Sequence, residues 1–158
     1  MEKEKLSFLT EIEKLKERHA LAAQVTPDYY EPGMMEYLEQ SYGEFDETSN
    51  AFILRFEVKG TRYEGRTELI ETVKEGEPIL VERDKENSFN PNNFTFFTKK
   101  RKNLGHMPAE LCNAIAPLYD EDYLEFHDAK ISYVEPISKR SRHAKQAILF
   151  VELTGMLK

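Results

Sequence analysis

Apolar residues near the start of the chain repeat with the period of an α-helix. Between residues 3 and 20, Glu and Lys separate positions that would share one helical face, which are Leu6, Leu9, Ile12, Leu15 and His19. Because these positions are three or four residues apart, the pattern predicts an amphipathic helix.

A segment of turn-forming residues separates this helix from a second, shorter one. Pro27 cannot continue a helix, and the pair Pro32-Gly33 is typical of a turn. Helical spacing then returns as far as Gly43, at Met34, Tyr37, Leu38 and Tyr42. We therefore expect a helical hairpin whose apolar faces pack on the rest of the chain or on another copy of it.

The hydrophobic pattern changes at Ala51 to a period of two. Charged residues such as Arg55 and Glu57 now alternate with apolar ones, which are Phe52, Leu54, Phe56 and Val58. This alternation predicts a half-buried strand. We place a domain boundary at residues 48–50, so that an N-terminal helical appendage, 1–48, precedes a second domain, 51–158.

Several more short segments of the second domain have the composition of strands. They are residues 78–82, 93–98, 103–106, 124–134 and 146–153. Pro108 suits the first position of a helix that buries Leu111, Ile115 and Leu118. Six short strands with one or two helices predict a mainly β fold with α, built as a small, partly open barrel rather than a doubly wound sheet.

The net charge of -7 is concentrated in one part of the chain. Residues 1–50 hold 12 Asp and Glu against 5 Lys and Arg, whereas residues 51–158 hold 17 of each kind. The second domain is therefore neutral and contains two basic clusters, at 99–102 and 139–145. A run of like charges is typical of a solvated hairpin tip, but it also attracts phosphate, so overall acidity does not exclude a nucleic-acid partner.

Cysteine content and hydropathy indicate the cellular setting. The single cysteine, Cys112, excludes an internal disulfide framework and agrees with a reducing compartment. The sequence has no apolar run of membrane-spanning length and no signal-peptide pattern after Met1. We expect a soluble, cytoplasmic protein that does not associate with membranes.

Motifs in the second domain resemble those of the HIRAN domain family. Residues 58–63 read VKGTRY beside the first strand. Residues 80–84 read LVERD, and the asparagine-rich loop 87–93 reads NSFNPNN. Residues 104–108 read LGHMP and precede the helix. The motifs have the order and spacing of the family, and the resemblance covers about residues 51–155.

The resemblance implies both a fold and a function. HIRAN domains are OB-like barrels, often at the front of helicase-like remodelling enzymes that repair stalled replication forks. There they capture the 3' end of single-stranded DNA. The resemblance therefore implies an OB-like barrel and a DNA-binding module that recognises DNA 3' ends in DNA repair, here without a motor.

The asparagine-rich loop departs from the family pattern at two places. The family's Tyr-Asp pair is Phe89-Asn90 here, and its Ala-Ile pair is Asn93-Phe94. A carboxylate accepts a hydrogen bond from a terminal 3'-hydroxyl as a charged partner, whereas Asn90 accepts one as a neutral amide. The first substitution therefore bears on the discrimination of a free 3'-hydroxyl.

Binding of single strands requires aromatic faces for the bases and cations along the phosphates. Phe89 and Tyr63 are the candidate faces, and arginine, lysine and His106 are the candidate cations. The predicted DNA-binding residues are Arg62, Tyr63, Arg83, Asn87, Phe89, Asn90, Lys99, Lys100, Arg101, Lys102 and His106.

The same residues also have structural interpretations. Arg62 and Arg83 are placed to form surface ion pairs with Glu64 or Asp84. Asparagines in turns bond their own backbone, so the asparagine-rich loop has a structural role of its own. Phe89 packs beneath that loop in this interpretation.

An enzyme is the first alternative function. His106, Glu110, Glu125 and His127 are residue types found in metal hydrolases. However, a helix that begins at Pro108 does not place His106 on a common face with Glu110. The sequence also lacks the HExxH, GxSxG, P-loop and Rossmann patterns. We expect no catalysis, no cofactor and no metal.

A protein-binding or regulatory module without nucleic-acid binding is the second alternative. In this interpretation the appendage, residues 1–48, docks a protein partner. Its carboxylates could instead lie over a basic groove as an autoinhibitory lid, and they are Glu31, Glu36, Glu39, Glu44, Asp46 and Glu47.

Overall fold

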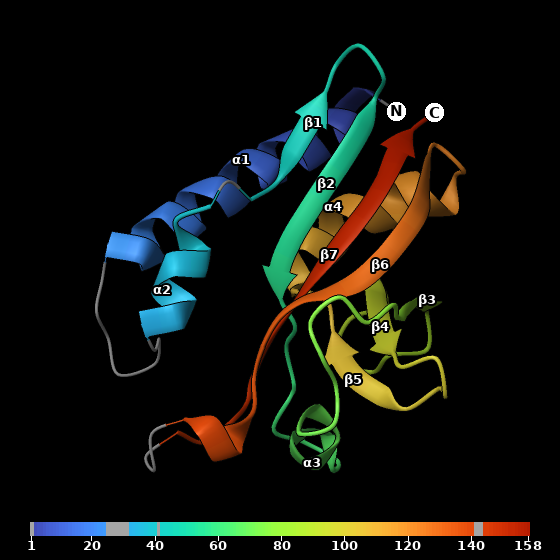
Figure 1. Ribbon diagram of the computed structural model, residues 1–158. Coiled ribbons are helices and arrows are strands. Elements are labelled where there is room, and N and C mark those ends of the chain that lie inside the picture. The colour runs from blue at the N-terminus through green and yellow to red at the C-terminus, as the bar shows by residue number, and fades with distance from the viewer. Residues whose placement is uncertain (1, 25–31, 41, 141–143) are drawn as a thin grey trace.

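Two antiparallel sheets form the body of the protein in the computed structural model (Figure 1). The model describes residues 2–24, 32–40, 42–140 and 144–158. The expected turn at Pro27, the carboxylate of Glu31 and part of the basic cluster 139–145 lie outside these ranges.

The larger sheet has four strands in the order β1-β2-β7-β6, and the smaller has three in the order β3-β4-β5. The strands of the larger sheet are β1 (Glu44–Asp46), β2 (Ala51–Glu57), β6 (Leu124–Glu135) and β7 (Ile148–Leu157). Those of the smaller sheet are β3 (Leu80–Asp84), β4 (Asn93–Phe97) and β5 (Asn103–His106). The mainly β fold with α is confirmed, and the sheets do not close into one barrel.

Helices cover one side of the larger sheet and fill the connections (Figure 1). They are α1 (Glu2–Gln24), α2 (Pro32–Leu38), α3 (Arg66–Ile70), α4 (Ala109–Asp120) and the short 3-10 helix η1 (Ile137–Lys139). Pro108 is the N-cap of α4, because its fixed φ suits the start of a helix and no backbone N–H is needed there. None of the helices in the described ranges is long and apolar enough to cross a membrane.

Alternation of side chains explains how the strands form the core. In β2, Phe52, Leu54 and Phe56 are buried, while the residues between them are more exposed. In β4, the rings of Phe94 and Phe96 are fully buried on the inner face of the smaller sheet. A period of two therefore directs one face of each sheet into a shared core.

The two sheets meet at a close backbone contact next to β5. The N–H of Lys59 donates to the carbonyl of His106 over 2.8 Å, and the N–H of His106 donates to the carbonyl of Lys59 over 2.9 Å. Gly105 has a φ of 132°, and a Cβ there would lie 2.4 Å from the carbonyl oxygen of Lys59. Only glycine fits this joint.

The amphipathic face of α1 packs into the core of the β domain. Phe8, Ile12 and Leu15 belong to the same buried cluster as Phe52. The rings of Phe8 and Phe52 are edge to face with centroids 5.2 Å apart. The apolar face of α1 therefore packs on the rest of the chain, whereas the division into domains 1–48 and 51–158 stays a prediction.

Helix α2 packs on β7, away from the smaller sheet (Figure 1). Met34 and Leu38 form a second buried cluster with Ile148 and Phe150. In the described residues the acidic hairpin thus covers the larger sheet, and the lid over a basic groove is not the arrangement observed.

Four details differ from the expected elements. Pro32-Gly33, expected to form a turn, begins helix α2, because proline suits the first positions of a helix. Helix α2 ends at Leu38, earlier than expected, and the buried Tyr42 beyond it donates its hydroxyl to the carbonyl of Tyr37. Strand β1 was not expected because three residues are too short for a clear period. Helix α3 was missed for the same reason, since it has five residues.

Replacement of Phe8 by alanine should reveal how strongly α1 supports the barrel. We expect Phe8→Ala to lower the free energy of unfolding by about 4 kcal/mol, because it leaves a cavity beside Phe52. Leu6→Ala, in the same helix but 61% exposed, should change it by less than about 0.5 kcal/mol. Urea unfolding followed by circular dichroism measures both, and equal effects would contradict the packing role of Phe8.

His19 should make stability depend on pH. Burial lowers its pKa from 6.5 to about 4, and its Nε2–H donates to the carbonyl of Arg55 over 3.1 Å. The folded state therefore favours the neutral ring, so this stabilisation is complete above pH 6.5 and is lost as the pH falls towards 4.

The loss should reach about 3 kcal/mol in the wild-type chain. His19→Gln keeps a donor but does not ionise, so its stability should fall less over the same interval. Thermal unfolding at a series of pH values compares the two slopes. Parallel slopes would show that His19 does not cause the effect.

Candidate functional site

The asparagine-rich loop, residues 87–93, is fixed by its own side chains. The Oδ1 atom of Asn87 accepts hydrogen bonds from the backbone N–H groups of Phe89 and Asn90, over 3.0 and 2.9 Å. The Oδ1 atom of Asn90 accepts the N–H of Asn92 over 2.9 Å. These are Asx turns, which replace regular backbone pairing. The loop therefore has a defined shape.

Helix α4 holds this loop from one side through Asn113. Its Oδ1 atom accepts hydrogen bonds from the side-chain amides of Asn90 and Asn92, over 3.2 and 3.1 Å. The sequence does not single out Asn113, because nothing about an exposed helical asparagine indicates a loop partner more than 20 residues away. Both polar atoms of the Asn90 side chain, Nδ2 and Oδ1, therefore form hydrogen bonds that hold the loop.

Arg83 braces the asparagine-rich loop from β3. Its guanidinium donates to both carboxylate oxygens of Asp120 over 2.9 Å, and to the carbonyls of Pro91 and Asn93 over 2.7 and 3.2 Å. It also lies 5.5 Å from the ring centroid of Phe94. The side chain of Arg83 is only 11% exposed, so most of its donors are directed to other groups of the protein.

The ion pair of Arg83 differs from the one considered from sequence. Its partner is Asp120 at the end of α4 rather than Asp84 or Glu64. Their hydrogen bonds raise the pKa of Arg83 and lower the pKa of Asp120, so both groups are charged at neutral pH. A contact between Arg83 and DNA stays a prediction.

Phe89 lies at the exposed tip of the loop. Its side chain is 96% exposed, which excludes the interpretation that it packs beneath the loop. The residues around it are held by hydrogen bonds, so the ring is displayed on a fixed backbone rather than on an unstructured one. The ring is therefore accessible to any ligand that approaches the loop.

Tyr63 and Arg62 form a second exposed unit in the connection after β2. The guanidinium of Arg62 lies 4.9 Å from the ring centroid of Tyr63 and donates to its hydroxyl over 2.6 Å. Tyr63 is 52% exposed. An aromatic face with a cation on it is thus formed before any ligand arrives.

Arg66 is a buried cation beneath this unit, and sequence reasoning missed it. It is 6% exposed, donates to the carbonyl of Gly60 over 2.9 Å and pairs with Glu64 over 3.2 Å. Its buried Nε atom has no hydrogen-bond partner in the described structure. The pairing of Glu64 with Arg66 corrects the expected pair with Arg62. No signal in the sequence indicated that Arg66 is buried, because it is a single arginine in a polar segment.

His106 connects the two parts of the site. Its Nδ1 atom accepts the side-chain amide of Asn93 over 3.0 Å and lies 3.2 Å from the hydroxyl of Thr95. Its ring lies beside Gly60, 3.5 Å from where a Cβ would stand. Burial and the charge of Arg66 lower the pKa of His106 below 6.5. Both effects favour the neutral ring, whereas a contact between His106 and DNA stays a prediction.

The basic run 99–102 lies at the turn between β4 and β5. Lys99, Lys100 and Lys102 are exposed, and Arg101 pairs with Glu82. Phe97 and Asn93 are the two ends of β4, so the turn lies roughly 13 Å along the strand from the asparagine-rich loop. The structure does not bring this run into contact with the other predicted site residues.

The predicted residues thus divide into one site and one separate cluster. The site residues are Arg62, Tyr63, Arg83, Asn87, Phe89, Asn90 and His106, to which the structure adds Arg66, Asn93 and Asn113. Phe89 and Tyr63 are the exposed aromatic residues of this candidate site, and the ring of His106 lies between Asn93 and Gly60. The described ranges contain no group of three or more His, Cys, Asp or Glu that could hold a metal ion.

Comparisons with known proteins agree with this architecture. A family model described as HIRAN domain matches residues 52–148, more than half of the chain, and confirms the resemblance. The HIRAN domain of human HLTF superposes with a TM-score of 0.50 at 20% identity, covering 67% of this chain and 76% of that one. A protein from Lactobacillus plantarum gives 0.51 at 18% identity, covering 66% and 95%. At these identities the two structures show the fold alone, and no curated protein matches the chain.

Replacement of Arg83 by lysine tests the brace. Lysine keeps the charge but cannot form the two-pronged bond to Asp120 together with the bonds to the loop. We expect Arg83→Lys to lower the free energy of unfolding by about 2 kcal/mol. Arg101→Lys is a matched control, because its side chain is 60% exposed and its ion pair should contribute less than about 0.5 kcal/mol. Indistinguishable urea midpoints would contradict the brace.

Proposed function

Because the chain belongs to the HIRAN domain family, we propose that it is a DNA-binding module that takes single-stranded DNA across the site between Phe89 and Tyr63. We further propose that it recognises 3' ends and serves DNA repair or the processing of stalled forks. In this proposal the chain acts by binding and has no catalytic role.

The exposed ring of Phe89 carries the proposal. It is 96% exposed on a loop fixed by Asn87, so its position costs little further ordering when a base stacks on it. Base–aromatic stacking contributes roughly 1–3 kcal/mol per base and tolerates any sequence. Such a ring is suited to a single strand, whose bases are unpaired.

Tyr63 supports the proposal as a second stacking face. Arg62 lies on its ring with part of its guanidinium directed to the hydroxyl, which fixes a cation beside the face. A guanidinium held in this way suits a phosphate oxygen, because its planar donors match the geometry of phosphate.

Arg66 adds a buried positive charge to the floor of the site. Its Nε donor has no partner in the described structure, and its one ion-pair partner, Glu64, is 76% exposed. A buried cation neutralised only by a solvated carboxylate favours an anion nearby. This charge supports the proposed path of the phosphates past His106.

We propose that Asn90 contacts the 3' end of the DNA strand. It stands where the family has an aspartate, and its Oδ1 atom already accepts the N–H of Asn92. A second lone pair remains for a 3'-hydroxyl. Because this acceptor is neutral, we expect the preference for a free 3' end to be modest.

Fluorescence anisotropy of labelled DNA tests the proposal. The probes are a short single strand with a 3'-hydroxyl, the same strand with a 3'-phosphate, and a blunt duplex, each at two salt concentrations. We expect the free 3'-hydroxyl strand to bind most tightly and all binding to weaken with salt. Equal, salt-sensitive binding of all three would remove end recognition. No binding at low salt would overturn the proposal.

Phe89→Ala is the variant that reports on the site. Loss of one stacking face should weaken binding of the single strand about tenfold. Stability should not change, because the ring is almost fully exposed. Leu21→Ala, an exposed apolar residue of α1, is the control and should leave affinity unchanged. Equal affinities of the two variants would exclude Phe89 from the interface.

A further inference from the structure

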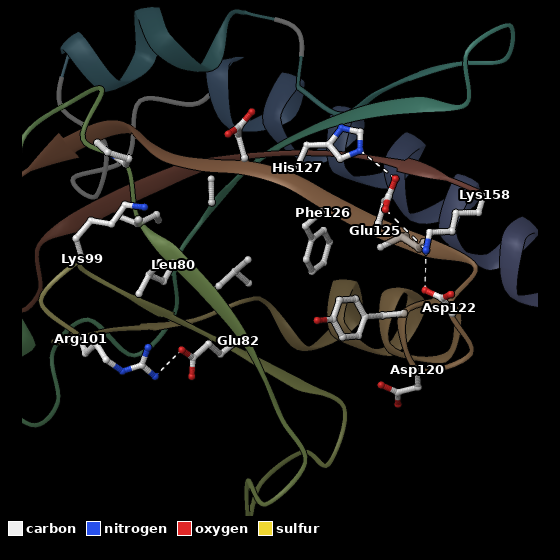
Figure 2. Close-up of a pocket in the computed structure, with 17 residues that line it drawn as sticks. Leu80, Glu82, Lys99, Arg101, Asp120, Asp122, Glu125, Phe126, His127 and Lys158 are labelled. Atoms are coloured by element: carbon white, nitrogen blue, oxygen red, sulfur yellow. Dashed lines mark hydrogen bonds and ion pairs between the residues drawn. The ribbon is translucent and has the colours of Figure 1, made fainter.

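A groove runs along the open side of the barrel, between β3 and β6 (Figure 2). Its volume is about 820 Å³. At one end of the groove the residue before β3 is joined to β6, where the N–H of Ile79 donates to the carbonyl of Ala129 over 3.0 Å. From there on, no backbone hydrogen bond joins β3 to β6 in the part of the chain that the structure describes. Each strand is the outer strand of its sheet, so the groove has an unpaired backbone edge on either side.

The edge of β3 is the more suitable of the two for pairing. All five of its residues pair with β4 in continuous register, so its opposite edge presents regular N–H and C=O groups. The register of β6 with β7 shifts between Phe126 and Asp128. Such a bulge disturbs the spacing of backbone groups and hinders the addition of another strand.

The floor of the groove is apolar. Phe126 and Tyr119 stack with centroids 5.3 Å apart, and both rings are only partly buried. Figure 2 shows the ring of Phe126 directed into the space between β6 and Leu80 of β3. Leu80 and Val81 line the same space and are also only partly buried. These side chains form a strip that one face of an extended chain would cover.

The rim of the groove is acidic. Carboxylates outnumber lysine and arginine side chains five to three among its lining residues. The ion pairs of Arg101 with Glu82 and of Lys158 with Asp122 and Glu125 neutralise charges of both signs, so they leave the excess of carboxylates in place. Asp120 is also paired, with Arg83 outside the groove lining, so the remaining excess is small. Asp128, one of these five carboxylates, is exposed beside His127. The rim repels phosphate and favours a basic ligand, which distinguishes the groove from the proposed DNA site.

We propose that this groove binds an extended, basic peptide that adds a strand to the free edge of β3. The backbone of the peptide pairs with residues 80–84, and every second side chain points to the floor at Phe126. Apolar residues occupy those positions, and lysine or arginine residues lie beside the carboxylates of the rim. The proposal is independent of DNA binding.

A peptide display library tests the proposal on the full chain. Selection from random nine-residue peptides should enrich sequences in which apolar residues alternate with lysine or arginine. Amide hydrogen exchange with the tightest synthetic peptide should then slow at least about tenfold at residues 80–84, because strand addition protects unpaired N–H groups. The same peptide should not displace labelled single-stranded DNA.

Charge reversal at the rim provides matched variants. Glu125→Lys combined with Asp128→Lys should weaken peptide binding about tenfold or more, since both carboxylates line the groove. Glu44→Lys also reverses an exposed carboxylate on an edge strand, but on β1, and should leave peptide affinity unchanged. Comparison of the unfolding midpoints of these variants distinguishes lost binding from misfolding.

Three results would overturn the proposal. They are a library that enriches no peptide, a peptide that binds all variants equally, and a bound peptide that leaves exchange in β3 unchanged. Amide exchange at residues 80–84 could also slow as the protein concentration rises, with no peptide present. That result would show that the ligand of β3 is a second copy of the chain and not a peptide.

Discussion

The contact between Lys59 and His106 is the constraint on which the rest of the structure depends. Two backbone hydrogen bonds join the sheets there, and a side chain at Gly105 would collide with the carbonyl of Lys59. Because the joint fixes the end of β5, it also fixes the ring of His106 between Asn93 and Gly60. The asparagine-rich loop and the connection that carries Tyr63 are therefore neighbours as a result of backbone geometry.

Local patterns in the sequence predicted the strands well, because alternating apolar residues have only one way to bury one face of a sheet. Strand β5 was predicted with its observed bounds, Asn103–His106. The sequence did not decide whether Phe89 is exposed or what shape its loop has, because a ring next to asparagines is found both in cores and at ligand sites. The roles of Arg66 and Asn113 could not be predicted, because each depends on a partner that only the folded chain brings near.

Arg83 shows why the site was harder to predict than the fold. Its charge and its place in a family motif indicated a contact with DNA, while neighbouring Asp84 indicated a surface ion pair. The structure gives it Asp120, 37 residues away, together with two carbonyls of the loop. An arginine has donors for several partners at once, and sequence separation says nothing about which of them it meets. Arg83 therefore holds the asparagine-rich loop in place through hydrogen bonds. This role does not depend on whether Arg83 also contacts a ligand.

The incomplete barrel follows from an asymmetry between its two junctions. At Gly105 the absence of a side chain lets two backbones meet. At the other junction, Pro78 has no N–H to donate, and the register of β6 shifts between Phe126 and Asp128. The strands diverge from that point and leave β3 unpaired on one side. Arg83 lies in this same strand and holds the carbonyls of the asparagine-rich loop. The strand with the free edge and the loop that displays Phe89 are thus connected through the side chain of Arg83.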